Sequence, residues 1–275
     1  MLPLVLYHAN CFDGFCAAWV ARRALGEIEA IPVHYGQRPP KVAGRDVYIL
    51  DFSYKRDVLK QMGVDSKTLL VLDHHESAAQ ELKDVFPNGA DTASTEFYGC
   101  SCIFDMTKSG GRLAWDYWFP GEPSPWLVDY TEDRDLWRHK LPSSREINAA
   151  LRSYPMDFDT WDLWHKYHSG NLGPFIDEGR TIRRVEAQIV DTHVRNAREI
   201  EMDGHKILSV NATVLFSEIA GELAHGRPFG ACWFVRQDGK RQWSLRSRDG
   251  GINVAEIAKL HGGGGHPQAA GFEED

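Results

Sequence analysis

The chain has few cysteines, and their spacing excludes the usual structural roles. The five cysteines form an odd set without any Cys-x-x-Cys pair: Cys11, Cys16, Cys100, Cys102 and Cys232. Structural zinc sites need ligands at short, fixed spacings, and disulfide frameworks are typical of small secreted domains. The sequence therefore argues against a zinc-stabilised or disulfide-linked fold, and it favours a reducing, cytoplasmic location.

Long apolar runs are missing as well. The longest, such as 69–72, are far shorter than the roughly 20 apolar residues that cross a bilayer. The N-terminal segment 1–8 is apolar, but it has neither a basic start nor a small-residue cleavage site, so we interpret it as a first strand and not as a signal peptide. We expect no membrane partner.

Positive charge is in short supply: 31 Lys and Arg face 39 Asp and Glu, which gives a net charge of −8. Proteins that coat duplex nucleic acid present a basic surface, because release of counterions from the phosphates drives that binding. We therefore expect no stable binding of duplex nucleic acid. An acidic protein can still act on phosphates if bound metal and a few local cations supply the positive charge.

Polar side chains follow three short apolar runs, 4–7, 47–50 and 69–72. Continuous apolar runs separated by helical stretches, here 15–25 and 55–62, indicate parallel strands that are buried on both faces. Open α/β sheets place their ligand sites just beyond the carboxyl ends of the strands. The side chains expected at that edge are His8, Asp13, Asp51, Asp73, His74 and His75.

Carboxylates and imidazoles at one sheet edge indicate a metal site. Their oxygen and nitrogen atoms suit Mn²⁺, with Mg²⁺, Zn²⁺ or Fe²⁺ as alternatives. Such ligands can hold two ions about 4 Å apart, bridged by a shared carboxylate. A single Asp after a strand is usually a turn residue or a helix N-cap. Its repetition after three strands favours metal binding, by one or two ions.

Two further segments carry candidate site residues. The run 130–137 contains Asp133 and Asp135, either as one inward-facing acid at a helix end or as a surface run of mixed charge. Residues 261–272 read HGGGGHPQAAGF, and glycines without Cβ let successive backbone amides converge on an anion. We interpret this second segment as a phosphate-binding loop, with four candidate residues: Gly263, Gly264, Gly265 and His266.

A local basic patch is predicted upstream of the glycines. The segment 236–248 contains five cations and one acid around a hairpin signal at 237–240. Arg246 is the cation expected to contact phosphate, because an arginine at a strand end can bind a phosphate with two parallel hydrogen bonds. Most of the other four cations are expected to be ordinary exposed residues of the strands, without a role in phosphate binding.

Three motifs in this order resemble the DHH phosphoesterase superfamily with its DHH-associated C-terminal domain. They are Asp-His-His at 73–75, the DGF-x-AAW stretch at 13–19, and GGGGHPQAAGF at 262–272. Relatives in that superfamily include RecJ-type exonucleases, nanoRNases and phosphatases acting on 3′-phosphoadenosine 5′-phosphate. The resemblance spans nearly the whole chain. It implies two lobes, with the catalytic metals on the N-terminal lobe and the substrate held by the C-terminal one.

The resemblance also implies roles for single residues. His8 and Asp13 match the first metal motif, Asp51 the second, and Asp73 with His74 the third. Of the third, His74 is expected to bind metal, while Asp73 and His75 orient ligands and water. In the fourth motif Asp135 is the closer match and Asp133 the alternative, and Arg246 and His266 match substrate-phosphate positions.

One position departs from the family pattern. The first motif usually carries Asp-x-Asp, and this chain has Cys11-Phe12-Asp13 there. A thiolate can ligate a softer ion but is a poor partner for Mg²⁺. Cys11 therefore stays a candidate ligand, and the number of ions, one or two, stays open.

The expected fold is α/β, with a mostly parallel sheet flanked by helices, a long connecting helix and a smaller C-terminal α/β domain. The predicted boundaries are 1–172 for the catalytic domain, 173–198 for the helix and 199–275 for the substrate-binding domain. Between the motifs, 94–169 is expected to be mostly helical, with its tryptophans in the core.

The function expected first is a phosphodiesterase that cuts short oligonucleotides or small nucleotides to mononucleotides. A phosphomonoesterase, a cyclic-dinucleotide hydrolase or a pyrophosphatase of the same superfamily is an alternative. From a different class, Cys11 is compatible with a catalytically weakened nucleotide-binding module. The oligomeric state is open, with a dimer among the options.

Overall fold

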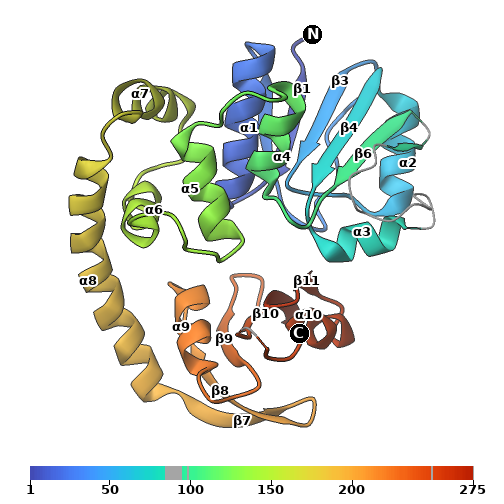
Figure 1. Cartoon of the computed structure of the whole chain (residues 1–275). Helices are drawn as coiled ribbons and strands as arrows, with labels where there is room; N and C mark the ends of the chain where they lie inside the picture. Colours follow the sequence, from blue (N-terminus) through green and yellow to red (C-terminus); the bar gives the residue numbers. More distant parts are fainter. Residues whose placement is uncertain (84–94, 98, 249, 275) are drawn as a thin grey trace. The chain divides into compact units, whose positions relative to one another are not determined.

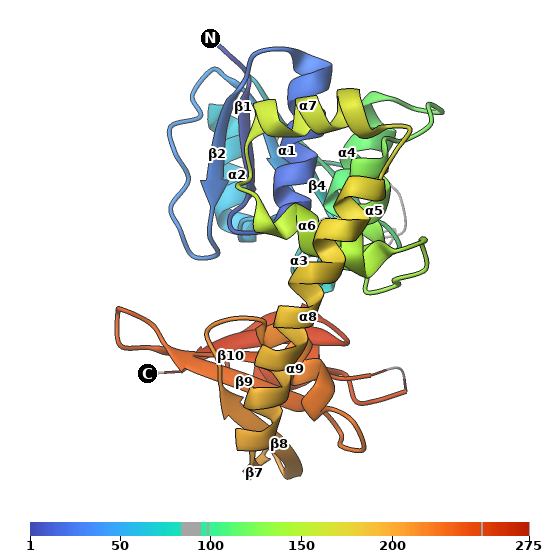
Figure 2. The ribbon, with the colours of Figure 1, turned by 90° about the vertical axis from the view of Figure 1, so that its left-hand side faces the viewer.

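The computed structural model describes residues 1–83, 95–97, 99–248 and 250–274. The chain divides into two compact units, Met1–Arg180 and Thr181–Asp275. The boundary lies within one continuous helix, α8 (Gly173–Asn196), of 24 residues (Figure 2). Among the described residues, no helix has the length and apolar character needed to cross a membrane.

The first unit is built on a six-stranded sheet with the order β2-β1-β3-β4-β6-β5. Five of the strands are parallel, and β5 runs antiparallel to β6 at one edge. In chain order the strands are β1 (Leu4–His8), β2 (Glu29–Val33), β3 (Asp46–Leu50), β4 (Thr68–Asp73), β5 (Thr95–Phe97) and β6 (Cys100–Phe104).

Helices cover both faces of this sheet, because its strands are apolar on both sides. On β4, Leu70 and Leu72 belong to one core cluster, while Leu69 and Val71 belong to the other. The second cluster is closed by α2 (Arg56–Asp65) and α3 (Glu76–Leu82) (Figure 1). The first is closed by α1 (Phe12–Leu25), α4 (Gly110–Trp118), α5 (Trp126–Asp135), α6 (Ser144–Ser153) and α7 (Phe158–His168).

The long helix α8 contributes to the core of each unit. Its first turns carry Phe175 into the first unit, and Val190 and Val194 near its other end pack in the second. Gly179 lies where α8 meets α6, since a Cβ there would come within 1.8 Å of the Glu146 carbonyl oxygen. A larger residue at position 179 would force the two helices apart.

The second unit contains another six-stranded sheet, with the order β11-β12-β10-β9-β8-β7. Only the β8–β9 pair is parallel among its described pairings. Separate apolar clusters join the sheet to α9 (Phe216–Leu223) and to α10 (Val254–Leu260). The strands are β7 (Arg198–Met202), β8 (His205–Asn211), β9 (Gly230–Val235), β10 (Arg241–Arg246), β11 (Gly264–His266) and β12 (Ala269–Glu274).

The expected fold class is confirmed: an α/β unit with a mostly parallel sheet, a long helix and a smaller α/β unit. The expectation that 94–169 is mostly helical is wrong at its start, because β5 and β6 lie there and extend the sheet. Its tryptophans are buried at 115, 126, 161 and 164, whereas Trp137 is 41% exposed.

Candidate metal centre

The polar residues predicted at one sheet edge do come together there. His8 ends β1, Asp51 follows β3 and Asp73 ends β4, and these three parallel strands are adjacent in the sheet. Adjacent parallel strands present their carboxyl ends at the same edge. Asp51 and Asp73 are buried, with at most 1% of each exposed. Buried carboxylates need compensating partners, which the neighbouring segments supply.

Two groups of potential ligands lie side by side at this edge. Asp13, His74 and Asp135 form one, and His8, Asp51 and His75 form the other; within each, the ligand atoms lie within 4.8 Å of one another. In the first group the His74 Nε2 lies 3.5 Å from Asp135 Oδ2 and 3.6 Å from Asp13 Oδ2. Three of the six are carboxylates and three are imidazoles, the mixed oxygen and nitrogen set that suits Mn²⁺ and related ions.

Asp51 contacts both groups. One carboxylate oxygen lies 3.0 Å from His74 Nε2, and the other lies 3.5 Å from His8 Nδ1. The backbone of Asp51 is left-handed, with φ of 54°. A non-glycine residue in this region costs roughly 1–3 kcal/mol and is common at functional sites. The turn after β3 therefore aims the carboxylate between the two groups at an energetic cost.

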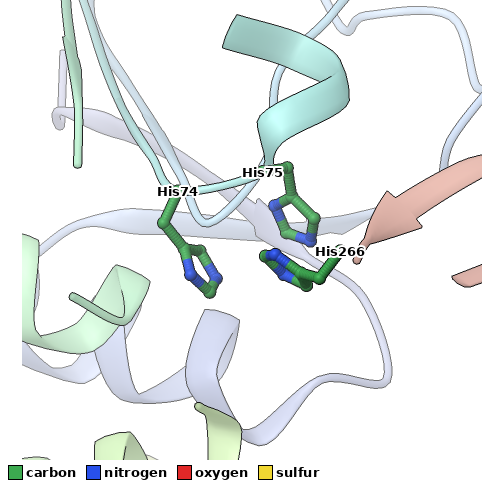
Figure 3. A group of neighbouring side chains, drawn as sticks. All are labelled: His74, His75 and His266. Atoms are coloured by element: carbon green, nitrogen blue, oxygen red, sulfur yellow. The ribbon is translucent and has the colours of Figure 1, made fainter. Parts of the chain in front are cut away.

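Asp73 organises the turn between β4 and α3 instead of facing the ligand groups. Its Oδ1 accepts from the backbone amides of His74 and His75, at 2.7 and 3.2 Å, and it contacts His75 Nδ1 at 2.7 Å. Ser53 donates to Oδ2 at 2.6 Å. Figure 3 shows the two imidazoles leaving this turn; the third labelled side chain, His266, belongs to the second unit. Asp73 thus sets the orientation of His75.

Asp13 is held by the start of α4, which the sequence reasoning missed. The backbone amides of Gly110 and Gly111 donate to its two oxygens, at 2.5 and 2.9 Å. A Cβ on Gly110 would lie 2.5 Å from the Asp51 Cβ, so only glycine lets the helix approach this closely. The available signal was Ser109, whose side chain caps the helix, followed directly by two glycines.

The charges of the cluster favour a bound cation. Burial and the carboxylates of Asp135 and Asp51 hold the pKa of Asp13 well above its usual range, and burial also raises the pKa of Asp135. Although burial lowers it, the hydrogen bond to Asp51 and the charge of Asp135 raise the pKa of His74 to about 10. Without a metal, the proton held by His74 offsets the repulsion between the carboxylates. A divalent ion bound there would offset the same repulsion.

Unsatisfied atoms point the same way. Apart from their 3.5 Å contact with each other, the buried atoms Asp51 Oδ2 and His8 Nδ1 have no hydrogen-bond partner in the part of the chain that the structure describes. Buried polar atoms are almost always bonded to protein, water or an ion. The residues present therefore fit a divalent cation, by donor type, by charge and by these two unsatisfied atoms.

The two doubtful ligand candidates occupy different environments. Cys11 is half-buried at the N-cap of α1 and belongs to neither ligand group among the described residues. Burial, with the carboxylates of Asp51 and Asp135, raises the pKa of its thiol well above the usual range, so the group stays protonated. Asp133 accepts from the backbone amides of Lys140 and Leu141, at 2.9 and 3.2 Å, and closes the loop after α5.

The substrate-side candidates lie in the second unit, where the cationic segment is mostly paired. Arg246 donates to Ser217 Oγ at 2.7 Å and to the Leu245 carbonyl at 2.8 Å. The neighbouring arginines contact carboxylates within their own unit: Arg236 with Asp238 and Glu273, Arg241 with Glu274, and Arg248 with Glu222. The predicted basic patch is therefore largely neutralised.

The glycine run is not the loop that we expected. Gly264, Gly265 and His266 form the edge strand β11, which pairs antiparallel with β12. A Cβ on Gly263 would lie 2.1 Å from a β12 carbonyl oxygen, and one on Gly265 would lie 2.5 Å from another. The glycines are thus needed for close strand packing, and their sequence pattern alone did not distinguish this from an anion-binding loop.

Comparisons with known proteins agree with this architecture. Residues 191–274 match the DHHA1 domain family. An uncharacterized protein of Acanthamoeba polyphaga mimivirus is 28% identical over 296 residues, covering 98% of this chain and 67% of that protein. Among solved structures, RecJ from Thermus thermophilus in complex with Mn²⁺ shares the fold at 13% identity and a TM-score of 0.51, covering 100% of this chain and 50% of RecJ.

A second solved structure, the DHH domain of a protein described as a member of a family of ribosomal proteins, gives a TM-score of 0.51 at 11% identity. It covers 98% of this chain and 82% of that one. The chain thus combines a parallel α/β unit, with acids and imidazoles at its carboxyl edge, and a DHHA1 unit. Residues 191–274 therefore form a DHHA1 domain, and the whole chain shares the fold of a RecJ from Thermus thermophilus.

Proposed function

We propose that this protein is a metal-dependent phosphoesterase that hydrolyses the phosphodiester bonds of short oligonucleotides or small nucleotides to mononucleotides, with Mn²⁺ as its ion. The observation that carries the proposal is the position of Asp51, whose two oxygens face two adjacent ligand groups. A carboxylate shared between two cation positions is the arrangement that two-metal phosphoesterases use. The fold shared with a Mn²⁺-containing RecJ supports the same class.

In this proposal five residues hold the ions: His8, Asp13, Asp51, His74 and Asp135. Bound there, divalent ions would neutralise the phosphoryl oxygens and lower the pKa of an attacking water. The amides of Gly110 and Gly111 fix the Asp13 carboxylate. Asp135, which lies beside His74, is the proposed fourth-motif ligand, because Asp133 is engaged by the loop after α5. Cys11 is proposed to stay outside the coordination sphere as a neutral thiol.

Asp73 and His75 are proposed to handle protons. Although burial lowers the pKa of His75, the adjacent Asp73 carboxylate raises it above its usual value, which favours the protonated imidazole. The contact between Asp73 and His75 Nδ1 fixes the ring orientation. A protonated, oriented imidazole beside the metal centre can donate its proton to the leaving oxygen of a phosphodiester. Arg246 and His266 are the proposed phosphate contacts in the second unit.

A short substrate fits the charge of the chain better than a long polymer. The net charge is −8, and three arginines of the cationic segment are paired with acids. Grasping a long strand requires a continuous cationic track, because each phosphate contact needs its own counter-charge. A small nucleotide or a short oligonucleotide needs only the metal centre and one or two cations.

The proposal is tested by hydrolysis of a labelled short RNA, a dinucleotide and 3′-phosphoadenosine 5′-phosphate, each with Mn²⁺, with Mg²⁺ and with chelator. We expect mononucleotides to be released with Mn²⁺ and none with chelator. Asp51→Asn should abolish release, whereas Asp46→Asn should not, since Asp46 lies at the opposite end of β3 and pairs with Lys67. Turnover that survives chelation, or that survives Asp51→Asn, would refute the metal mechanism.

A binding module without catalysis is the second candidate, favoured by the neutral thiol at Cys11 where the family carries an acid. It predicts nucleotide binding without hydrolysis of any of the three substrates across a panel of divalent ions. Release from 3′-phosphoadenosine 5′-phosphate alone would instead identify a phosphomonoesterase.

A further inference from the structure

Tyr35 lies beside the candidate metal centre but belongs to neither ligand group. It follows β2, the neighbour of β1 in the sheet. Its ring contacts the His8 ring edge-on, with centroids 5.2 Å apart, and the His75 ring at 6.1 Å. On a third side it packs against Phe52, at 4.8 Å. Three rings, two of them from the centre itself, therefore fix the position of Tyr35.

Despite these contacts, 54% of Tyr35 is exposed, whereas Phe52 is 1% exposed. Immobilising an aromatic ring at a surface leaves its apolar area in water, so packing alone does not account for a ring that is held and yet open. A rigid, half-exposed ring next to a phosphate-binding centre is suited to hold a second flat, apolar group. The base of a nucleotide is a flat, apolar group of this kind, joined to the phosphate through the sugar.

We propose that Tyr35 is a specificity residue, which stacks on the base attached to the bound phosphate and so selects nucleotides over phosphate esters that lack a base. The proposal rests on the proposed function and names the part of the substrate that the metal centre does not contact. Stacking of one base on an aromatic side chain strengthens binding by roughly 5- to 150-fold. It tolerates any base, because every base has a flat face.

The same contacts allow a purely supporting role, in which Tyr35 only holds His8 and His75 in place. The two roles predict different results. A supporting residue would change metal binding and the binding of every phosphate alike. A stacking residue would leave metal binding unchanged and would affect only ligands that carry a base.

The experiment compares AMP with ribose 5-phosphate, which has the same sugar and phosphate and no base. Binding of each is measured by calorimetry with Mn²⁺ present, for the wild type, Tyr35→Phe and Tyr35→Ala, and bound Mn²⁺ is measured separately. Tyr167→Ala is the control, since Tyr167 is a 64% exposed tyrosine on α7. Neither ligand has a phosphodiester bond, so the readout does not require the proposed reaction.

We expect the wild type to bind AMP more tightly than ribose 5-phosphate. Tyr35→Ala should weaken AMP binding about tenfold while sparing ribose 5-phosphate and Mn²⁺; Tyr35→Phe, which keeps the ring, and the control should match the wild type. Equal binding of the two ligands by the wild type would overturn the proposal, and so would an equal loss of both, or of Mn²⁺, in Tyr35→Ala. If the wild type bound AMP more tightly than ribose 5-phosphate but hydrolysed none of the oligonucleotides, the stacking role of Tyr35 would be supported and the proposed phosphoesterase activity refuted.

Discussion

Replacing Gly110 by alanine tests whether the start of α4 positions the proposed metal ligands Asp13 and Asp51. The added methyl group would lie 2.5 Å from the Asp51 Cβ and 3.0 Å from Asp13 Oδ2. Carbon atoms in contact are normally about 3.5–4.0 Å apart, so α4 or Asp51 has to move by about 1 Å. Asp51 is buried and has little room to yield. We therefore expect α4 to retract and weaken its hydrogen bonds to Asp13.

The size of the effect follows from two contributions. Overpacking a buried site costs about 1–3 kcal/mol. Loss of a hydrogen bond to a charged group costs about 1.5–3 kcal/mol, part of which appears as weaker ion binding because Asp13 is then free to turn. Alanine in a helix otherwise gains up to about 1 kcal/mol over glycine. The net expectation is a loss of about 1–3 kcal/mol in unfolding free energy and at least a tenfold loss in Mn²⁺ affinity.

Urea unfolding and Mn²⁺ titration measure the two effects separately. The control is Gly221→Ala, a glycine inside α9 whose added methyl group would meet nothing within 4 Å. That variant should be neutral or slightly stabilised and should bind Mn²⁺ normally. If Gly110→Ala behaved like this control in both assays, α4 would not be the element that positions Asp13.

Four further predictions concern the proposed ligand set. Asp135→Asn should lower Mn²⁺ affinity at least tenfold with little change in unfolding free energy. Asp133→Asn should keep Mn²⁺ but lose about 1–2 kcal/mol in urea unfolding, since it weakens the loop contacts of a buried carboxylate; the reverse pattern would exchange their roles. Cys11→Asp should strengthen Mn²⁺ binding about tenfold relative to Cys11→Ser, because a carboxylate is a better ligand for this ion than a neutral hydroxyl; equal affinities would mean that a side chain at position 11 does not reach the ions. In metal-free protein the pKa of His74 is raised from 6.5 to about 10, so the stability that it contributes is complete below about pH 6.5 and is lost as the pH rises to about 10. Urea unfolding across this range should show the loss in the wild type and not in His74→Gln.

The sheet and the edge that carries the candidate centre could be predicted because their signals are local. Apolar runs of four residues specify parallel strands buried on both faces, and the residue after each strand must then lie at the carboxyl edge. This is why Asp51 and His74 could be placed near each other although 23 residues separate them. The resemblance to a family added the fourth motif, which the strand pattern alone did not reach.

What could not be predicted depends on contacts between distant segments. The choice between Asp133 and Asp135 is made by the loop after α5, whose amides bind the first and leave the second beside His74. The role of Gly110 depends on how closely α4 approaches the turn after β3. Pairing of the arginines likewise depends on acids brought near by strand register, such as Glu273 opposite Gln242.

The left-handed backbone at Asp51 separates the chemistry of that position from its contribution to the fold. Asparagine adopts this conformation about as readily as aspartate, while most other side chains are strained in it. A single change to asparagine would therefore remove the shared negative charge and leave the turn intact. Under the proposed function, a relative with asparagine here would fold and keep the other proposed ligands but lack the charge between the two ion positions, so a non-catalytic protein of this fold is one substitution away.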